Sequence, residues 1–283
     1  LQMNDSVSDT IKSIVIAISA ILIIFAGLYL YAGNWPPVTI IESSSMQHGN
    51  HFTWGVINTG DIVLQKKITN ISQVVTYVQG RETGYSSYGD YGNVILYEPY
   101  PGSTSVIHRA MFYITWNGNT FHIKGQTEAI KEGWLIIKGY DIILENVGFS
   151  DRNLVVNVSS SSPYAGYMDL IGRDGFFTMG DNNLANSPFS NPNIIFPNIA
   201  YYACDQNVGI APGPISIGQI VGVAQGWLPW FGIIKLVLSG ETQYIPTDSY
   251  YYLTFTLAII VAIALIWDYF PEIKKLIKKF KYQ

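Results

Sequence analysis

Residues 106–116 read VIHRAMFYITW, a run of β-branched and aromatic residues with an adjacent histidine and arginine near its start. This composition is typical of a β-strand. Similar short runs occur at 60–64, 93–97, 135–138 and 176–179, and clusters of Gly, Pro, Asn and Ser separate them. The alternation of short strands with turn residues predicts antiparallel β-structure.

The region that contains these strands shows no apolar 3.6-residue period long enough for an amphipathic helix, and no internal repeat. We therefore expect a mainly β domain over residues 33–249. Two polar segments within it, 78–92 and 184–214, are longer than ordinary hairpin connections. Long loops of this kind are typically functional or mobile.

Two uncharged apolar runs flank this domain, at 14–32 and 250–267. The first run is 19 residues long, and at ~1.5 Å per residue it nearly crosses a hydrocarbon core of roughly 30 Å. Its length, and the sequence NWPP at 34–37 in place of a small-residue cleavage site, favour an uncleaved anchor over a cleavable signal peptide. We expect two transmembrane helices, with residues 1–13 and 268–283 on the same side of the membrane.

Charge indicates the orientation. Five lysines lie between residues 274 and 281, directly after the second run, and the positive-inside rule places them in the cytoplasm. They could also form a solvated helix face, and both interpretations are compatible with anionic lipid headgroups as partners. The segment between the runs has 16 acidic and 10 basic residues, a net charge of −6, so we expect it on the exported side without a nucleic-acid partner.

The sequence offers little for metal or redox chemistry. Cys204 is the only cysteine, so the chain forms no internal disulfide and has no cysteine cluster for a metal. His48, His51 and His122 show neither HExxH spacing nor paired carboxylates. We expect no metal site and no cofactor.

Short polar blocks follow the first apolar run in a definite order. They are Ser43-Ser44-Ser45-Met46, Gly60-Asp61-Ile62-Val63, His108-Arg109, Gly180-Asp181-Asn182-Asn183 and Gly218-Gln219-Ile220-Val221-Gly222. In this order they resemble signal peptidase I, a family in which a Ser-x-Ser-Met box follows a transmembrane anchor. The His-Arg pair is similar to that of archaeal and endoplasmic-reticulum members, whereas eubacterial members have Lys-Arg.

The resemblance implies a serine endopeptidase with Ser45 as nucleophile and His108 as general base. A serine hydroxyl is a poor nucleophile until a neutral base about 3 Å away removes its proton, and histidine is the side chain that titrates near neutrality. The resemblance also implies an oxyanion hole formed by the Ser43 hydroxyl and the N–H of Ser45. The implied fold is a signal-peptidase-like antiparallel β catalytic domain, in which residues 126–175 form an inserted lobe of unassigned role.

The third catalytic residue stays open. Asp181 would orient His108 directly or stiffen the loop around it, and the alternative is a turn aspartate that bonds its own backbone. Relatives with the His-Arg pair commonly carry another Asp where this chain has Ser187, so Asp205 or a Ser–His dyad alone are further alternatives. A second departure puts His48 where the family has proline, which leaves another histidine close to the nucleophile.

The implied substrates are signal peptides of exported preproteins, cleaved after small residues at the −1 and −3 positions. The implied location is the cell membrane, or the endoplasmic-reticulum membrane in a eukaryote, with the translocation machinery as a candidate partner. Residues 227–234 (WLPWFGII) would rest on the lipid interface or form a buried strand pair. The alternative function is a non-catalytic membrane-anchored surface or scaffold protein that kept the fold, which Ser187 and the long loops motivate.

Overall fold

The computed structural model describes residues 5–160, 168–191 and 199–281. The helices are α1 (Asp5–Ala32), α2 (Tyr77–Thr83), α3 (Gln126–Lys131), α4 (Asp181–Ala185), α5 (Asp205–Val208), α6 (Ile233–Ser239) and α7 (Thr247–Lys281), with 3-10 turns η1 (Ile71–Gln73) and η2 (Ile217–Gln219). The strands are β1 (Val38–Ile40), β2 (Ile62–Lys66), β3 (Ser86–Ser87), β4 (Asp90–Tyr91), β5 (Val94–Tyr97), β6 (Val106–Asn117), β7 (Thr120–Ile123), β8 (Leu135–Lys138), β9 (Asp141–Val147), β10 (Arg152–Asn157), β11 (Gly175–Met179), β12 (Ala200–Tyr202) and β13 (Ile220–Leu228).

The larger sheet has the strand order β1-β2-β13-β5-β6-β11, and β7 pairs with the far end of β6. Every neighbouring pair in it is antiparallel. The long strand β6 places His108 opposite Ile95 of β5, and Arg109 opposite Met179 of β11. Strand β13, late in the sequence, lies between β2 and β5 and so joins the two halves of the sheet.

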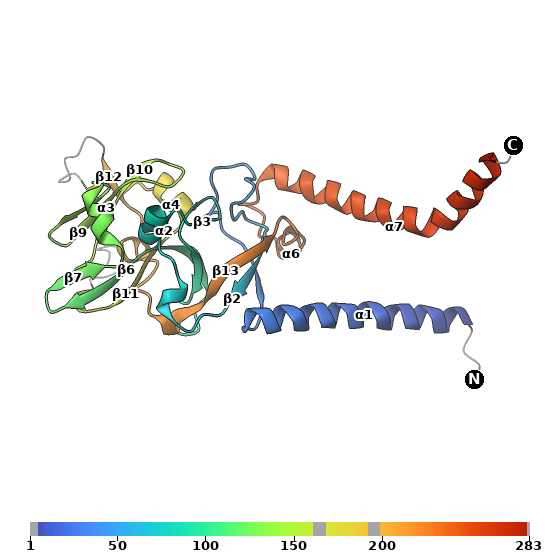
Figure 1. Ribbon diagram of the computed structural model, residues 1–283, viewed down its shortest axis with the longest axis horizontal. Coiled ribbons are helices and arrows are strands. Elements are labelled where there is room, and N and C mark those ends of the chain that lie inside the picture. The colour runs from blue at the N-terminus through green and yellow to red at the C-terminus, as the bar shows by residue number, and fades with distance from the viewer. Residues whose placement is uncertain (1–4, 161–167, 192–198, 282–283) are drawn as a thin grey trace.

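A second sheet has the order β12-β10-β9-β8 and lies at the end of the domain away from the terminal helices (Figure 1). Strands β8, β9 and β10 fall within residues 126–175, and β12 joins them in parallel to β10. A shared apolar core, which includes Phe112 of β6, Phe177 of β11, Ile142 of β9 and Leu154 of β10, packs this sheet against the larger one. Burial of these side chains fixes the lobe to the strand that carries His108.

The predicted antiparallel strands are confirmed, but the domain is mixed α/β because short helices lie between them. Segment 78–92 contains most of α2 and the β3–β4 hairpin, and segment 184–214 contains β12 and α5. The helices α2 to α6 span only four to seven residues each. Helices this short do not fill the window in which a 3.6-residue period becomes visible, so the sequence pattern could not reveal them.

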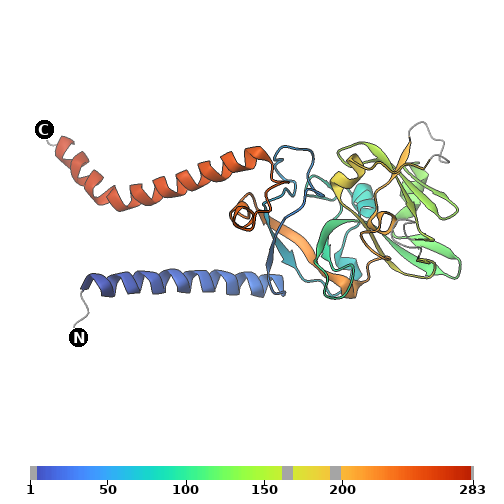
Figure 2. The ribbon, with the colours of Figure 1, turned by 180° about the vertical axis from the view of Figure 1, so that it is seen from behind.

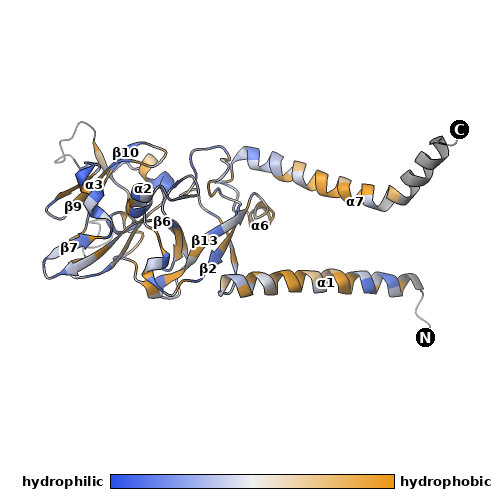
Figure 3. Cartoon of the chain, viewed as in Figure 1, coloured by the Kyte–Doolittle hydropathy of each residue, from blue (hydrophilic) through white to orange (hydrophobic). Residues whose placement is uncertain are grey.

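Helices α1 and α7 leave the domain at the same end and extend in the same general direction (Figures 1 and 2). Within them, Val7–Ala32 and Thr247–Trp267 have mean hydropathies of 2.6 and 2.0 and are long enough to cross a membrane. Almost none of either span is buried against protein, and apolar colour covers both (Figure 3). The two predicted apolar terminal helices are thus confirmed. The side chains of the predicted lysine run at 274–281 lie outside the described residues.

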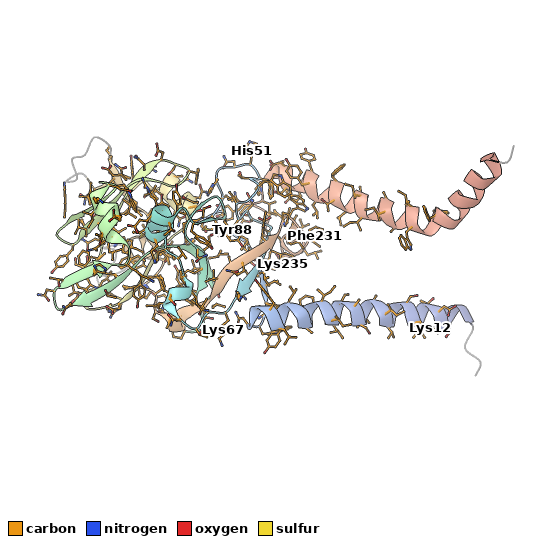
Figure 4. All side chains as sticks on the ribbon, in the orientation of Figure 1. Lys12, His51, Lys67, Tyr88, Phe231 and Lys235 are labelled. Carbon is orange, nitrogen blue, oxygen red and sulfur yellow. The ribbon has the colours of Figure 1, made fainter. Side chains whose placement is uncertain are left out.

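The aromatic segment 227–234 divides between interior and surface. Trp230 and Ile233 are buried in an apolar cluster with Phe52 and residues of α6 and α7, whereas Leu228 and Ile234 remain about half exposed. Helix α6 lies at the end from which α1 and α7 emerge, with Phe231 and Lys235 near that end (Figure 4). The segment is therefore not a wholly buried strand pair, and contact of its exposed side chains with a lipid interface stays a prediction.

Candidate active site

The loop that carries Ser45 connects β1 to β2 and is closed at its base by two backbone hydrogen bonds. The Ile41 amide donates to the Asp61 carbonyl at 2.9 Å, and the Gly60 amide donates to the Ile41 carbonyl at 2.8 Å. The buried Asp61 carboxylate accepts from the amides of Asn58 and Trp230, both at 2.9 Å. Burial raises the pKa of Asp61 to about 6. The Gly60-Asp61 block therefore closes the loop between β1 and β2 that carries Ser45, called the serine loop below. It also connects this loop to Trp230, which follows the end of β13.

Asn182 of α4 holds the backbone at Ser44 and Ser45. Its amide donates to the Ser45 carbonyl at 2.8 Å, and its side-chain Nδ2 donates to the Ser44 carbonyl at 3.0 Å. The Ser43 and Ser45 hydroxyl oxygens lie 3.2 Å apart. The Ser box and the Gly-Asp-Asn block thus touch directly, and the Ser43 hydroxyl, predicted to serve an oxyanion hole, lies beside the Ser45 hydroxyl, the predicted nucleophile.

His108 lies on β6, almost fully buried, and its Nδ1 lies 2.9 and 2.8 Å from the two carboxylate oxygens of Asp205. Asp205, at the start of α5, is fully buried and also accepts from the hydroxyls of Tyr97 and Thr178, each at 2.6 Å. Burial and the adjacent Asp205 raise the pKa of Tyr97, so its hydroxyl keeps its proton. This arrangement favours the tautomer with Nδ1–H toward Asp205, which leaves Nε2 as an acceptor on the opposite side of the ring.

Nε2 of His108 faces the serine loop across Gly180. A Cβ at position 180 would lie 2.8 Å from this nitrogen and 2.7 Å from the Ser45 carbonyl oxygen, so only glycine lets the two segments approach. Both Ser45 and His108 line one cleft of about 510 Å³, bordered by β1 on one side and residues 104–108 on the other. Within the described residues no hydrogen bond joins Ser45 Oγ to His108 Nε2. Catalytic hydrogen bonds are often long without substrate.

Asp181 has another role than orienting His108. Its carboxylate receives a bidentate pair from Arg109, Nε to Oδ1 at 2.8 Å and Nη2 to Oδ2 at 2.6 Å, and lies 3.1 Å from Nε2 of His48. Burial opposes its ionisation, but Arg109 outweighs burial and holds the pKa of Asp181 below its usual value. In the described part of the chain Asp181 makes no bond to His108, and the carboxylate that contacts the His108 ring is that of Asp205, one of the predicted alternatives.

Arg109 joins three parts of the domain. Besides Asp181, its Nη1 donates to four carbonyl groups of the β3–β4 hairpin, those of Ser87, Asp90, Tyr91 and Gly92. Its side chain is fully buried. The two residues of the His-Arg pair therefore have different contacts. His108 lines the cleft, and Arg109, on the other face of β6, bonds to α4 and to the hairpin.

Sequence reasoning placed Ser43, Ser45 and His108 in one site, and the structure brings them to one cleft. Ser187 occupies the position where the resemblance implies an aspartate, and its hydroxyl donates to the Tyr202 carbonyl at 2.5 Å. Tyr97 and Thr178 were missed because only the pairing of β5 and β11 with β6 brings them to Asp205. No local motif marks either residue.

In the described residues, no group of three His, Cys, Asp or Glu side chains is placed to hold a metal ion. Cys204 is buried, and burial raises the pKa of its thiol well above the ordinary value. A thiol of this kind is unreactive.

No protein-family model matches the chain, and no curated protein matches its sequence. The site is therefore interpreted from its own geometry and from the resemblance of its sequence blocks.

Proposed function

We propose that this chain is a membrane-anchored serine endopeptidase of the signal peptidase I type, which removes signal peptides from exported preproteins. The observation that carries the proposal is that Ser45 and His108 line one cleft while a buried aspartate, Asp205, holds the far side of the histidine ring. Serine, histidine and aspartate in this relation form the constellation that activates a serine hydroxyl in unrelated folds.

In the proposed reaction, Ser45 Oγ attacks the scissile carbonyl carbon and its proton passes to His108 Nε2. Asp205 orients the imidazole and stabilises the imidazolium that forms. The Ser45 amide and the Ser43 hydroxyl donate to the developing oxyanion. His108 then gives the proton to the leaving amine, and a water molecule, activated by the same histidine, releases the acyl group from Ser45.

The cleft suits an extended peptide. Strand β1 pairs with β2 and, among the described strands, has no partner on its other side, where the cleft runs. A peptide that adds to this edge would gain main-chain hydrogen bonds, and the cleft would receive alternate side chains. Its lining includes the aliphatic residues Ile41, Leu96, Ile107 and Ile210, which suits small apolar side chains beside the cleavage point.

The proposed location follows from the terminal helices. Because α1 and α7 leave the domain together, a bilayer that contains both would lie beside α6, whose Ile234, Val237 and Leu238 are exposed. Apolar side chains at this place would enter the lipid interface. With the lysine run in the cytoplasm, the catalytic domain lies on the exported face, where translocated preproteins emerge tethered to the membrane.

The test uses the full chain in lipid vesicles with a preprotein peptide that has small residues at −1 and −3, and mass spectrometry locates the cut. The wild type is expected to cleave after the −1 residue, and Ser45→Ala to lose cleavage by a factor of about 10⁴ or more. The matched control, Ser72→Ala, changes an exposed serine of η1 and is expected to keep the wild-type rate.

Equal cleavage by wild type and Ser45→Ala would disprove the serine mechanism. No cleavage by either protein, with both folded, would favour the alternative of a non-catalytic surface or scaffold protein. Cleavage that depends on Ser45 but ignores the −1 and −3 residues would indicate a membrane protease with other substrates.

A further inference from the structure

The loop that carries Ser45 also carries a second histidine in an unusual setting. His48 follows Ser45 by three residues, and its Nε2 lies 3.1 Å from Oδ2 of Asp181. Its ring stacks on Phe149, with ring centroids 4.3 Å apart and an angle of 19° between the planes. The His48 side chain is only 9% exposed, although it belongs to a surface loop. Two contacts of different kinds therefore fix the position of this ring.

The carboxylate that His48 contacts is itself immobile. Asp181 is held by Nε and Nη2 of the fully buried Arg109, and the next residue, Asn182, donates to the Ser44 and Ser45 carbonyls. The serine loop is thus attached to α4 at two points. One is the backbone of Ser45 itself, and the other is the ring of His48.

Phe149 belongs to the turn between β9 and β10, in the second sheet. At the start of β10, Arg152 Nη1 donates to the carbonyls of Leu184 and Ala185 at 2.6 and 2.8 Å, at the C-terminal end of α4. The β9–β10 hairpin therefore contacts the serine loop through Phe149 and α4 through Arg152. The serine loop and α4 therefore both contact the lobe formed by residues 126–175.

We propose that His48, clamped between Phe149 and Asp181, is a positioning residue that holds Ser45 in its reactive place, and that this clamp is a function of the inserted lobe. The inference rests on the function proposed above. His48 does not line the cleft that Ser45 and His108 share, so it acts through the backbone of residues 45–48. Reacting atoms must be placed to within a fraction of an ångström, and a displacement of about 1 Å costs up to 10²-fold in rate.

Kinetics of the full chain in vesicles, with the preprotein peptide, test the clamp. His48→Ala is expected to lower kcat about tenfold to a hundredfold with KM changed less than about twofold, because the loop shifts while the cleft persists. Phe149→Ala should lower kcat by roughly threefold to tenfold, and the double variant should be no slower than His48→Ala, since both remove one clamp. His48→Gln, which can still donate to Asp181, should recover part of the loss.

A kcat of His48→Ala within twofold of the wild type would overturn the clamp, as would losses that multiply in the double variant. The matched control is His122→Ala, which removes an exposed histidine of β7 and is expected to keep the wild-type kcat. Thermal unfolding of every variant identifies a loss that comes from global destabilisation. Wild-type melting temperature with lowered kcat supports the clamp.

Amide hydrogen exchange separates the clamp from the proposed function, because it needs no substrate. The peptides that cover residues 43–50 and 180–186 are expected to exchange faster in His48→Ala and Phe149→Ala than in wild type or His122→Ala. Faster exchange in the two variants, together with a wild type that cleaves nothing, would support the clamp and refute the peptidase. Unchanged exchange would refute the clamp, even in an active enzyme.

Discussion

The domain contains two buried histidine–aspartate pairs that differ in what surrounds the carboxylate. Among the described residues, the donors to the Asp205 carboxylate besides the His108 imidazole are the neutral hydroxyls of Tyr97 and Thr178. Asp181, beside His48, is already neutralised by a bidentate arginine. The first pair opens onto the cleft, and the second is covered by Phe149.

The difference shows why a short His–Asp distance does not identify a catalytic pair. The positive charge of Arg109 balances the negative charge of Asp181, so Asp181 stabilises an imidazolium only weakly. Its contacts fit a structural role. A carboxylate held by neutral donors keeps its negative charge for the histidine that it orients. Only the His108 pair combines an available charge with access to Ser45.

The largest effect is expected from Asp205→Asn. An amide at this position keeps the shape but removes the negative charge and permits the wrong tautomer of His108, so kcat should fall by about 10³–10⁴. The protein should stay folded, which its melting temperature checks. A loss below about tenfold would place the Ser–His dyad alone at the centre of the reaction.

Asp181→Asn should act mainly on stability. It leaves the fully buried Arg109 without its counter-charge, at a cost of about 3–5 kcal/mol in the free energy of unfolding. Denaturant unfolding in detergent measures this loss. Asp151→Asn, which changes an exposed aspartate of the β9–β10 turn, is the control and should be nearly neutral.

Acid should have the same effect on the wild type as this substitution. Because the folded-state pKa of Asp181 lies below its unfolded value of 3.8, its contribution is present above about pH 4 and is lost as pH falls toward the folded-state pKa. The loss should be absent from Asp181→Asn. An equal loss of stability in acid for both proteins would assign it to other carboxylates.

The smallest effect is expected from Tyr97→Phe, which removes one of the hydroxyls that hold Asp205. Thr178 still donates to the carboxylate, so the catalytic barrier should rise by about 1 kcal/mol, roughly fivefold in kcat. Tyr100→Phe, at an exposed tyrosine, is the matched control. A hundredfold loss for Tyr97→Phe would show that the hydroxyl does more than orient the carboxylate.

Much of the fold was predictable from local sequence. The β-branched and aromatic runs at 62–66, 94–97 and 106–117 are strands because such side chains pack well on a pleated surface. The terminal helices were predictable from unbroken apolar length. The short helices α2 to α6 were not, because their existence depends on caps and tertiary contacts rather than on periodicity.

The candidate site divides in the same way. Ser45 and His108 lie in short blocks whose order carries a resemblance, so both could be named from the sequence. Asp205 could be named only as one alternative, because 97 residues separate it from His108 and the packing of α5 against β11, the neighbour of β6, brings them together. The structural role of Asp181 depends likewise on Arg109, 72 residues away.

The central position of β13 has a consequence for the order of assembly. This strand separates β2, which ends the serine loop, from β5, which pairs with the histidine strand, yet it is made only at residues 220–228. Until it is synthesised, the two halves of the larger sheet have no strand to join them. Contacts between such distant parts of a chain form slowly. The larger sheet is therefore completed only when almost all of the domain before α7 has been made.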